Sequence, residues 1–356
     1  MGQRKRDIWL VTLYVKFFRW TGHTASITWR GIRAVWRKRM KINSLDVQAA
    51  AARIAGQVIR TPLIEASIDG RRVWLKCECL QTGGAFKLRG ATNRLLLLDN
   101  DERARGVVAF SSGNHAQGVA IAARRLGIAA TIVMPADAPA LKIDGTRAEG
   151  AGIIFYDRRT ENREAIAARI AAETGATLVP SFDDRDIVAG QGTVGLEILE
   201  QLAEAGAPPP PLIAIPVGGG GLAAGIALAC PDALILGAEP EGWDDMARSL
   251  AAGEIVPVAA DAPPTLCDAL QTPRVSPITF DILRERKATV VAVSDDEVGA
   301  AVRWAFEQHQ LVVEPGGAAA LAALLAGKVD VEEGMVIVLS GGNIDPALHT
   351  RLVASA

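Results

Sequence analysis

The stretch LIAIPVGGGGLAAGIALA, residues 212–229, decides the predicted fold. It begins with an uninterrupted apolar run of strand length and ends with small apolar residues that suit a buried helix. Four glycines, at positions 218–221, lie at the switch between the two, where they let backbone N–H groups approach an anion at a helix start. The stretch therefore predicts a strand–loop–helix unit of an open parallel sheet, with a phosphate-binding loop; a flexible turn is the alternative.

Outward from this unit, short apolar runs alternate with helical segments in both directions. Such alternation is typical of α/β proteins whose parallel sheets are covered by helices on both faces. We expect strands at residues 72–79, 107–110, 130–134, 152–156, 177–179, 233–238 and 335–339, and helices at 44–56, 86–99, 115–126, 140–150, 160–174, 190–205, 295–308 and 315–326.

Length and composition narrow the class of protein. A chain of 356 residues suits two domains of ordinary size. A net charge of -2 and an aromatic content of 5% give no basis for nucleic-acid binding. The cysteines lack the usual spacing of metal ligands, so we interpret them as free core thiols in a reducing compartment, the cytoplasm. They are Cys77, Cys79, Cys230 and Cys267.

The first 39 residues differ from the rest and form an atypical basic and aromatic extension. They hold ten of the 38 Lys and Arg residues, four of the seven tryptophans and one acid, Asp7. The apolar run at residues 8–15 is too short to span a bilayer. Three interpretations stay open: a spurious extension upstream of a natural start at Met40, a segment that touches a membrane surface, and a targeting peptide. For the core of the chain we expect no membrane contact.

Two polar loops follow predicted strands, and a lysine begins a predicted helix. The hydroxyls, amide and backbone N–H groups at residues 111–115 suit a carboxylate, although helix capping alone is the alternative. Ser340, in the turn at residues 340–343, follows the last strand, where an ordinary turn explains it equally well. Lys87 lies beside Phe86 at the start of an apolar helix. A buried amine there suits Schiff-base chemistry, and an exposed lysine is the alternative.

In this order, the segments AFKLRGA around Lys87, SSGNHAQG from Ser111, the four-glycine loop and the SGGN turn resemble the fold-type II pyridoxal-phosphate (PLP) enzymes. The likeness is greatest to the serine/threonine dehydratase (ammonia-lyase) and serine racemase branch, and it covers about residues 45–346. It implies two doubly wound domains similar to the tryptophan synthase β subunit, with PLP in the cleft between them. The large PLP-binding domain would comprise residues 40–103 plus 184–356 and the small domain residues 104–183. A homodimer is also implied.

The resemblance implies a role for each matching residue. Lys87 would hold PLP as a Schiff base and remove the substrate α-proton. Ser112 corresponds to the racemase serine that protonates the opposite face, but many dehydratases carry it too. The implied cofactor-binding residues are Phe86, Lys87, Asn114, Gly218, Gly219, Gly220, Gly221 and Ser340. Those implied to bind the substrate carboxylate are Ser111, Ser112, Gly113, Asn114 and His115.

An acidic segment at residues 239–245 is similar to the divalent-cation segment of the racemase-like enzymes. The likeness implies Glu239, Asp245 and the Trp243 carbonyl as ligands of Mg²⁺ or Ca²⁺; an acidic surface loop is the alternative. Arg163 and Glu164 align with a charged pair near the racemase active site, with a solvated helix face as the alternative.

The resemblance implies an enzyme that acts on a small amino-acid substrate. The leading hypothesis is PLP-dependent β-elimination from a hydroxy-amino acid such as L-threonine or L-serine, or a 3-hydroxyaspartate, which yields a 2-oxo acid and ammonia. Serine or aspartate racemisation is the first alternative. β-Replacement and non-catalytic PLP binding are weaker ones. Ala85 stands where the family often has serine, which leaves the substrate preference open.

Overall fold

The computed structural model of the chain describes residues 42–138 and 140–354. The extension predicted at residues 1–39 lies outside the described residues. Within the part that is described, no helix combines the length and apolar character needed to cross a membrane.

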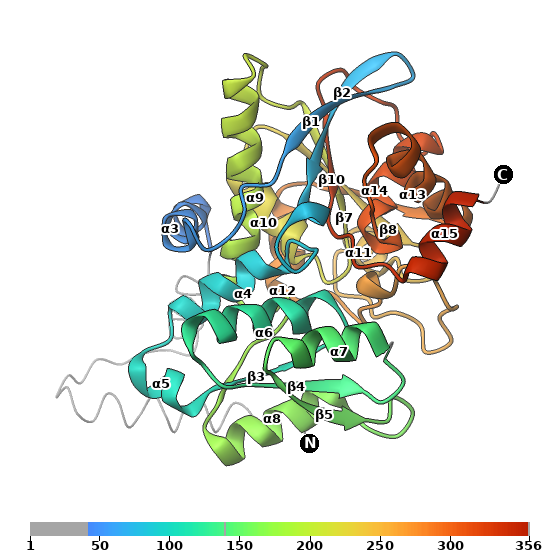
Figure 1. Cartoon of the computed structure of the whole chain (residues 1–356). Coiled ribbons are helices and arrows are strands. Elements are labelled where there is room, and N and C mark those ends of the chain that lie inside the picture. Colours follow the sequence, from blue (N-terminus) through green and yellow to red (C-terminus); the bar gives the residue numbers. More distant parts are fainter. Residues whose placement is uncertain (1–41, 139, 355–356) are drawn as a thin grey trace. The chain divides into compact units, whose positions relative to one another are not determined.

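The larger of two sheets has six strands in the order β1-β2-β10-β7-β8-β9. Every neighbouring pair runs parallel except β1 and β2. Figure 1 shows β10, from the end of the chain, beside β2, from its beginning. The strands are β1 (Leu63–Ile68), β2 (Arg71–Cys77), β7 (Leu212–Pro216), β8 (Leu234–Pro240), β9 (Thr289–Val293) and β10 (Val336–Leu339).

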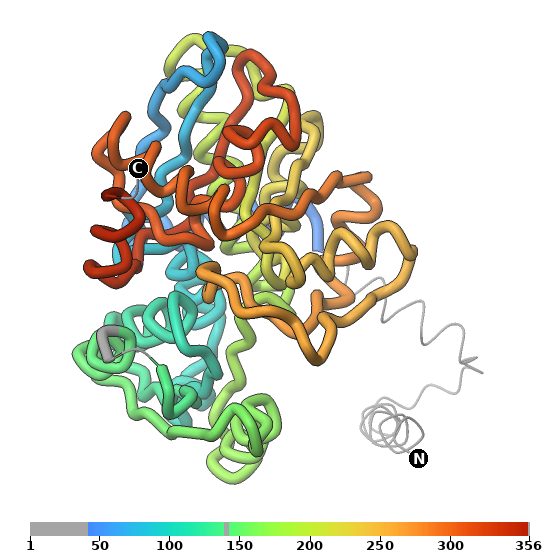
Figure 2. Tube along the Cα trace, turned by 90° about the vertical axis from the view of Figure 1, so that its right-hand side faces the viewer, coloured from blue at the N-terminus to red at the C-terminus, as the bar shows by residue number. Residues whose placement is uncertain are grey.

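The smaller sheet has four parallel strands in the order β5-β4-β3-β6. Figure 2 shows its green segments gathered below the blue and red segments that belong to the larger sheet. Its strands are β3 (Val107–Phe110), β4 (Ala130–Pro135), β5 (Gly152–Tyr156) and β6 (Thr177–Leu178). They fall inside residues 104–183, but the domain boundaries themselves stay a prediction.

Helices connect the strands and cover the sheets. They are α3 (Ser44–Ile54), α4 (Lys87–Leu96), α5 (Asn100–Arg105), α6 (Asn114–Leu126), α7 (Ala140–Ala148), α8 (Arg163–Thr174), α9 (Arg185–Glu204), α10 (Gly221–Ala229), α11 (Asp245–Ala252), α12 (Pro277–Glu285), α13 (Asp295–His309), α14 (Pro315–Leu325) and α15 (Pro346–Ala354). Two short 3₁₀ helices, η1 (Glu78–Leu80) and η2 (Asp268–Leu270), lie in loops.

Both faces of the six-stranded sheet are buried, as β10 illustrates. Ile337 and Leu339 point into a core shared with α13 and α14, whereas Val336 and Val338 point into a second core shared with α9 and α10. Alternate residues of one strand therefore meet helices on opposite faces, which is why the strand is apolar throughout. This arrangement confirms the predicted doubly wound α/β fold. All four cysteines are buried and free, which confirms their prediction as core thiols.

The structure corrects several expected elements. Strand β1 was not expected from the sequence; it forms an antiparallel hairpin with β2 through Asp69 (φ 52°) and Gly70 (φ 74°). Asp-Gly is a hairpin signal that the weak alternation of the strand obscured. Helix α9 begins at Arg185 rather than residue 190, because the Asp184 side chain accepts hydrogen bonds from its first turn. The helix expected at residues 86–99 ends earlier, and the Asp99 capping box starts α5 instead.

Candidate active site

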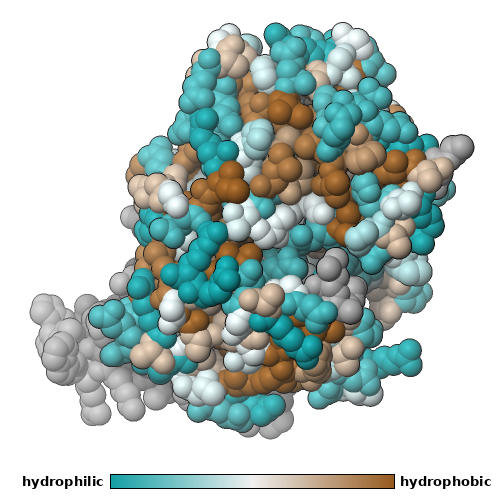
Figure 3. Space-filling model, in the orientation of Figure 1, coloured by the Kyte–Doolittle hydropathy of each residue, from teal (hydrophilic) through white to brown (hydrophobic). Residues whose placement is uncertain are grey.

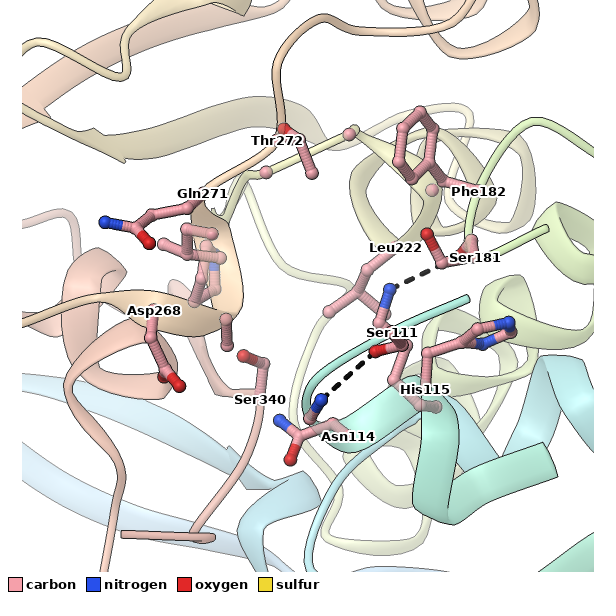
Figure 4. Close-up of a pocket in the computed structure, with 18 of the residues that line it drawn as sticks. Ser111, Asn114, His115, Ser181, Phe182, Leu222, Asp268, Gln271, Thr272 and Ser340 are labelled. Atoms are coloured by element: carbon pink, nitrogen blue, oxygen red, sulfur yellow. Dashed lines mark hydrogen bonds between the residues drawn. The ribbon is translucent and has the colours of Figure 1, made fainter. Parts of the chain in front are cut away.

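A pocket lies between elements of the two sheets, at the carboxyl ends of β3, β7 and β10. This is the edge at which open parallel sheets bind ligands. Figure 4 shows Asp268, Gln271 and Thr272 on one side of the pocket and Ser181, Phe182 and His115 on the other. All cofactor-binding and substrate-binding positions predicted from the sequence line it: Phe86, Lys87, Ser111, Ser112, Gly113, Asn114, His115, Gly218, Gly219, Gly220, Gly221 and Ser340.

Lys87 begins α4 and extends its amine into the pocket. The Nζ atom donates a hydrogen bond of 3.3 Å to the Ser181 carbonyl and lies 4.9 Å from the centroid of the Phe86 ring. Burial lowers the pKa of Lys87 to about 8, although the negative charge of Glu314 acts in the opposite direction. A substantial fraction of this amine is therefore neutral near physiological pH, as attack on a carbonyl requires.

A buried ionic network holds the first turns of α4. Arg89 is fully buried and donates to Glu78 and Glu197, with distances of 2.6–2.8 Å for the four charged contacts. Lys76, also fully buried, donates to Glu197 at 2.6 Å. Two cations and two carboxylates thus compensate one another, and they tie α4 to β2, η1 and α9.

The glycine loop between β7 and α10 leaves no room for side chains. A β-carbon on Gly219 would overlap the Phe182 ring, and one on Gly218 would lie 3.2 Å from the Leu270 backbone. Gly220 precedes α10 with φ +83°, a conformation that favours glycine. The Thr279 hydroxyl donates to the Gly219 carbonyl at 2.8 Å and fixes the loop. The loop therefore presents backbone at a helix N-terminus, which suits a phosphate.

The loop at residues 111–115 leads into α6. The Gly113 N–H donates to the Ser111 hydroxyl at 3.1 Å, and the side chains of Asn114 and His115 are buried. His115 Nε2 lies 2.9 Å from the Val179 carbonyl, which can only accept, so this nitrogen carries the proton. Burial lowers the pKa of His115 to about 3. The ring is consequently neutral, and the donors for a carboxylate are the hydroxyls and backbone N–H groups of the loop.

The turn after β10 is hydrogen-bonded to the segment before Lys87. The Phe86 N–H donates to the Ser340 carbonyl at 3.2 Å, and the Gly342 N–H donates to the Gly84 carbonyl at 2.8 Å. The side chain of Asn343 donates to Asn114 Oδ1 at 2.9 Å. Ser340, which is buried, therefore faces the same pocket as the lysine.

Two charged residues of the pocket, Glu314 and Asp268, had no role predicted from the sequence, and the role of Arg163 was open. Glu314 precedes the apolar helix α14, where an acid next to Pro-Gly-Gly is the only local signal. Arg163 lies at the start of α8, with its guanidinium carbon 5.7 Å from the Phe110 ring centroid. Asp268 pairs with Lys142 of α7.

The acidic segment at residues 239–245 does not line this pocket. Glu239 accepts hydrogen bonds of 2.9 Å from the Met246 and Ala247 N–H groups and so caps α11. Burial raises the pKa of Glu239 to about 8 and that of Asp245 to about 7. Among the described residues, no group of three or more His, Cys, Asp and Glu side chains is placed to hold a metal ion. The predicted site includes only two carboxylates and a backbone carbonyl, and it stays a prediction.

The pocket fits PLP on features of this chain alone. The half-buried amine of Lys87 is available for a covalent bond to an aldehyde. The glycine loop has space only for backbone, beside a helix N-terminus that suits a phosphate. Ser340, Asn114 and Phe86 provide a hydroxyl, an amide and an aromatic ring for a pyridine ring.

Comparison with known proteins gives the same assignment. Residues 54–341 match the family described as "Pyridoxal-phosphate dependent enzyme". An L-threo-3-hydroxyaspartate ammonia-lyase from Pseudomonas sp is 45% identical over 86% of this chain and 97% of its own. The structure of maize serine racemase is similar, with a TM-score of 0.81 and 38% identity over 87% of this chain and 96% of that one. The structure of a threonine deaminase from T.th. has a TM-score of 0.79 and 43% identity over 85% of this chain and 99% of that one. The chain therefore belongs to the fold-type II PLP-dependent enzymes, in the group of amino-acid ammonia-lyases and racemases.

Proposed function

We propose that the chain deaminates a 3-hydroxy-amino acid by β-elimination. The substrate loses its α-proton and its β-hydroxyl, in sum one water, and hydrolysis of the resulting enamine releases a 2-oxo acid and ammonia. Serine would give pyruvate, threonine 2-oxobutyrate, and 3-hydroxyaspartate oxaloacetate. The observation that carries the proposal is the position of Lys87, a half-buried amine of lowered pKa in the same pocket as Ser340 and the glycine loop.

Each group in the pocket has a part in this proposal. When bound, PLP withdraws electrons from the substrate α-carbon. Lys87 joins the cofactor and, once released, takes up the α-proton at Nζ. The four glycines bind the phosphate through backbone N–H groups. Ser340 would offer the pyridine nitrogen a hydroxyl, which does not transfer a full proton as a carboxylic acid would. The ring would therefore stabilise negative charge less, and loss of the β-hydroxyl would be favoured over a long-lived carbanion.

Arg163 favours a substrate with a second carboxylate. It lines the pocket, and no carboxylate of the described residues lies within ion-pairing distance of its guanidinium. An unpaired cation near a substrate site favours an additional negative charge. We therefore rank 3-hydroxyaspartate above serine and threonine, in agreement with the name of the Pseudomonas relative.

A substrate panel tests this ranking. The PLP-loaded protein is assayed for 2-oxo acid from L-serine, L-threonine and L-threo- and erythro-3-hydroxyaspartate. Arg163→Gln should lower kcat/KM for the preferred 3-hydroxyaspartate by about 10-fold to 100-fold, since a charged hydrogen bond is worth about 1.5–3 kcal/mol. Arg169→Gln, on the exposed part of α8, is the matched control. Equal losses on serine and 3-hydroxyaspartate would remove Arg163 from the proposal.

Racemisation is the second candidate, because Ser112 lines the pocket together with Lys87 and offers a second proton donor. Chiral analysis of the same reactions distinguishes the two activities. Growth of the D-enantiomer without 2-oxo acid would identify a racemase, and loss of that growth in Ser112→Ala would identify Ser112 as its second acid–base group.

Two further parts of the proposal concern assembly and a cation. The homodimer implied by the resemblance is supported by exposed hydrophobic side chains, among them Leu80 (46% exposed) and Val312 (42% exposed). Figure 3 shows hydrophobic atoms gathered over the upper part of the molecule on this face, where the six-stranded sheet lies.

The proposed cation is Mg²⁺ or Ca²⁺, since both prefer oxygen ligands. Its ligands would be the carboxylates of Glu239 and Asp245 and the carbonyl of Trp243.

A further inference from the structure

Glu314 is a buried acid in the pocket for which the proposed reaction names no part. Its side chain is only 2% exposed, and its carboxylate faces the residues around Lys87. Oε1 accepts a hydrogen bond of 2.5 Å from Asn114 Nδ2, whereas Oε2 is buried without a hydrogen-bond partner among the described residues. Burying a carboxylate with one oxygen unsatisfied costs free energy, and a role of this group in the site would explain why it is nevertheless there.

The surrounding structure makes room for this carboxylate. The Glu314 N–H donates to the Gly341 carbonyl at 2.9 Å. A β-carbon at Gly341 would overlap Glu314 Oε1 and would lie 3.1 Å from Asn114 Nδ2. The glycine after Ser340 is therefore required for the contact between Glu314 and Asn114 to form.

Glu314 also fixes the orientation of the Asn114 amide. A carboxylate only accepts hydrogen bonds, so the Asn114 NH₂ group must face it, while Asn114 Oδ1 accepts from Asn343 at 2.9 Å. The NH₂ group has two hydrogens, and one remains for a ligand in the pocket. A flipped amide would place its oxygen against Glu314 and lose both bonds.

Several charged groups face Glu314. Lys87 of α4 and Lys142 of α7 favour the ionised carboxylate, as does the hydrogen bond from Asn114 of α6. Burial and Asp268 of η2 oppose ionisation, and together they raise the pKa of Glu314 to about 7. In return, the carboxylate favours the protonated form of the Lys87 nitrogen.

We propose that Glu314 is a positioning residue of the active site, which holds the Asn114 amide with one N–H directed to PLP and supplies the negative charge that keeps the nitrogen between Lys87 and PLP protonated. Protonation of this nitrogen would make the carbon bonded to it the electrophile that a substrate amine attacks. The inference rests on PLP binding at Lys87, but it requires no particular substrate.

The charge is tested by titrating the visible absorbance band of the PLP-loaded full chain with pH. Glu314→Gln keeps the size of the side chain and removes the charge, so the midpoint of the spectral change should fall by about 1 unit or more. Glu307→Gln, an exposed glutamate on α13, is the control and should titrate as the wild type. A midpoint in the Glu314→Gln variant equal to that of the wild type would overturn the proposal.

Glu314→Asp keeps the test decisive if the Glu314→Gln variant does not retain PLP. The aspartate preserves the charge, so the midpoint should stay close to the wild-type value; a fall of about 1 unit would contradict the proposal. Because the readout needs no turnover, an incorrect substrate assignment would leave it unchanged. A wild-type protein without any band would instead refute the Lys87 assignment, and this inference with it.

The positioning of Asn114 is tested by PLP affinity in a double-mutant cycle. Glu314→Ala and Asn114→Ala should each raise the Kd for PLP, and the double variant should raise it by less than the product of the two single effects, because part of the effect of Glu314 acts through Asn114. Fully additive losses would contradict this part of the proposal.

Discussion

Arg89 provides a direct test of how the structure holds helix α4, which begins at Lys87. Replacing Arg89 with leucine removes the guanidinium that bonds Glu78 and Glu197 and leaves Glu78 fully buried without its cation. Breaking one partner of a buried ion pair costs about 3–5 kcal/mol. A typical domain has only about 5–15 kcal/mol of stability in total, so the expected loss is a large share of it.

Urea unfolding of the PLP-free protein measures this loss. The control is Arg124→Leu, which breaks an ion pair with Glu149 where the arginine side chain is 58% exposed; such surface pairs contribute about 0–1 kcal/mol. The double variant Arg89→Leu with Glu78→Leu should recover part of the loss, since it no longer buries an unpaired carboxylate. A destabilisation by Arg89→Leu no larger than that of the control would refute the reasoning.

Three further predictions concern the pocket and the acidic segment. Gly219→Ala should weaken PLP binding with the fold retained, because the new methyl group overlaps the Phe182 ring; fluorescence titration with PLP measures this, and unchanged affinity would contradict the glycine-loop assignment. The pKa of His115 is about 3 when folded and near 6.5 when unfolded, so its contribution to stability is present above about pH 6.5 and is lost as the pH falls towards 3. Because of His115, the unfolding free energy of the wild type should decrease over this range by up to about 1.4 kcal/mol per pH unit, and the His115→Gln variant should lack this part of the decrease. Parallel curves of unfolding free energy against pH for the two proteins would disprove the buried neutral state. Mg²⁺ or Ca²⁺ should raise the Tm of the wild type but not of Asp245→Asn, and an equal rise in both would exclude the predicted cation site.

The sequence was sufficient for the fold class and for the predicted cofactor-binding and substrate-binding positions, all of which line the pocket. The strand–glycine–helix unit at residues 212–229 specifies its own local structure, because an apolar run must be buried and glycines at its end have few alternative uses. Loops at the carboxyl ends of parallel strands then meet at one edge of the sheet. Within the six-stranded sheet this rule brings the glycine loop after β7 near the SGGN turn after β10, whereas residues 111–115 follow β3 of the other sheet and reach the pocket through the packing of the two sheets.

What the sequence did not reveal depends on contacts between distant segments. Glu314 and Asn114 are 200 positions apart, and a single acid before a helix gives no sign of its partner. The network around Arg89 joins four elements, so Glu197 looks like an ordinary helix residue in the sequence. Helix α9 differs from these cases, because the Asp184 cap that starts it at Arg185, and not at the predicted residue 190, is a local signal.

The most direct test of the central claim is to locate the cofactor on the chain. Borohydride reduction of the PLP-loaded protein fixes the cofactor to its lysine, and peptide mass spectrometry identifies that lysine. The account predicts the label on Lys87. A label on another lysine, such as the buried Lys76 or Lys142, would contradict it, as would no label at all.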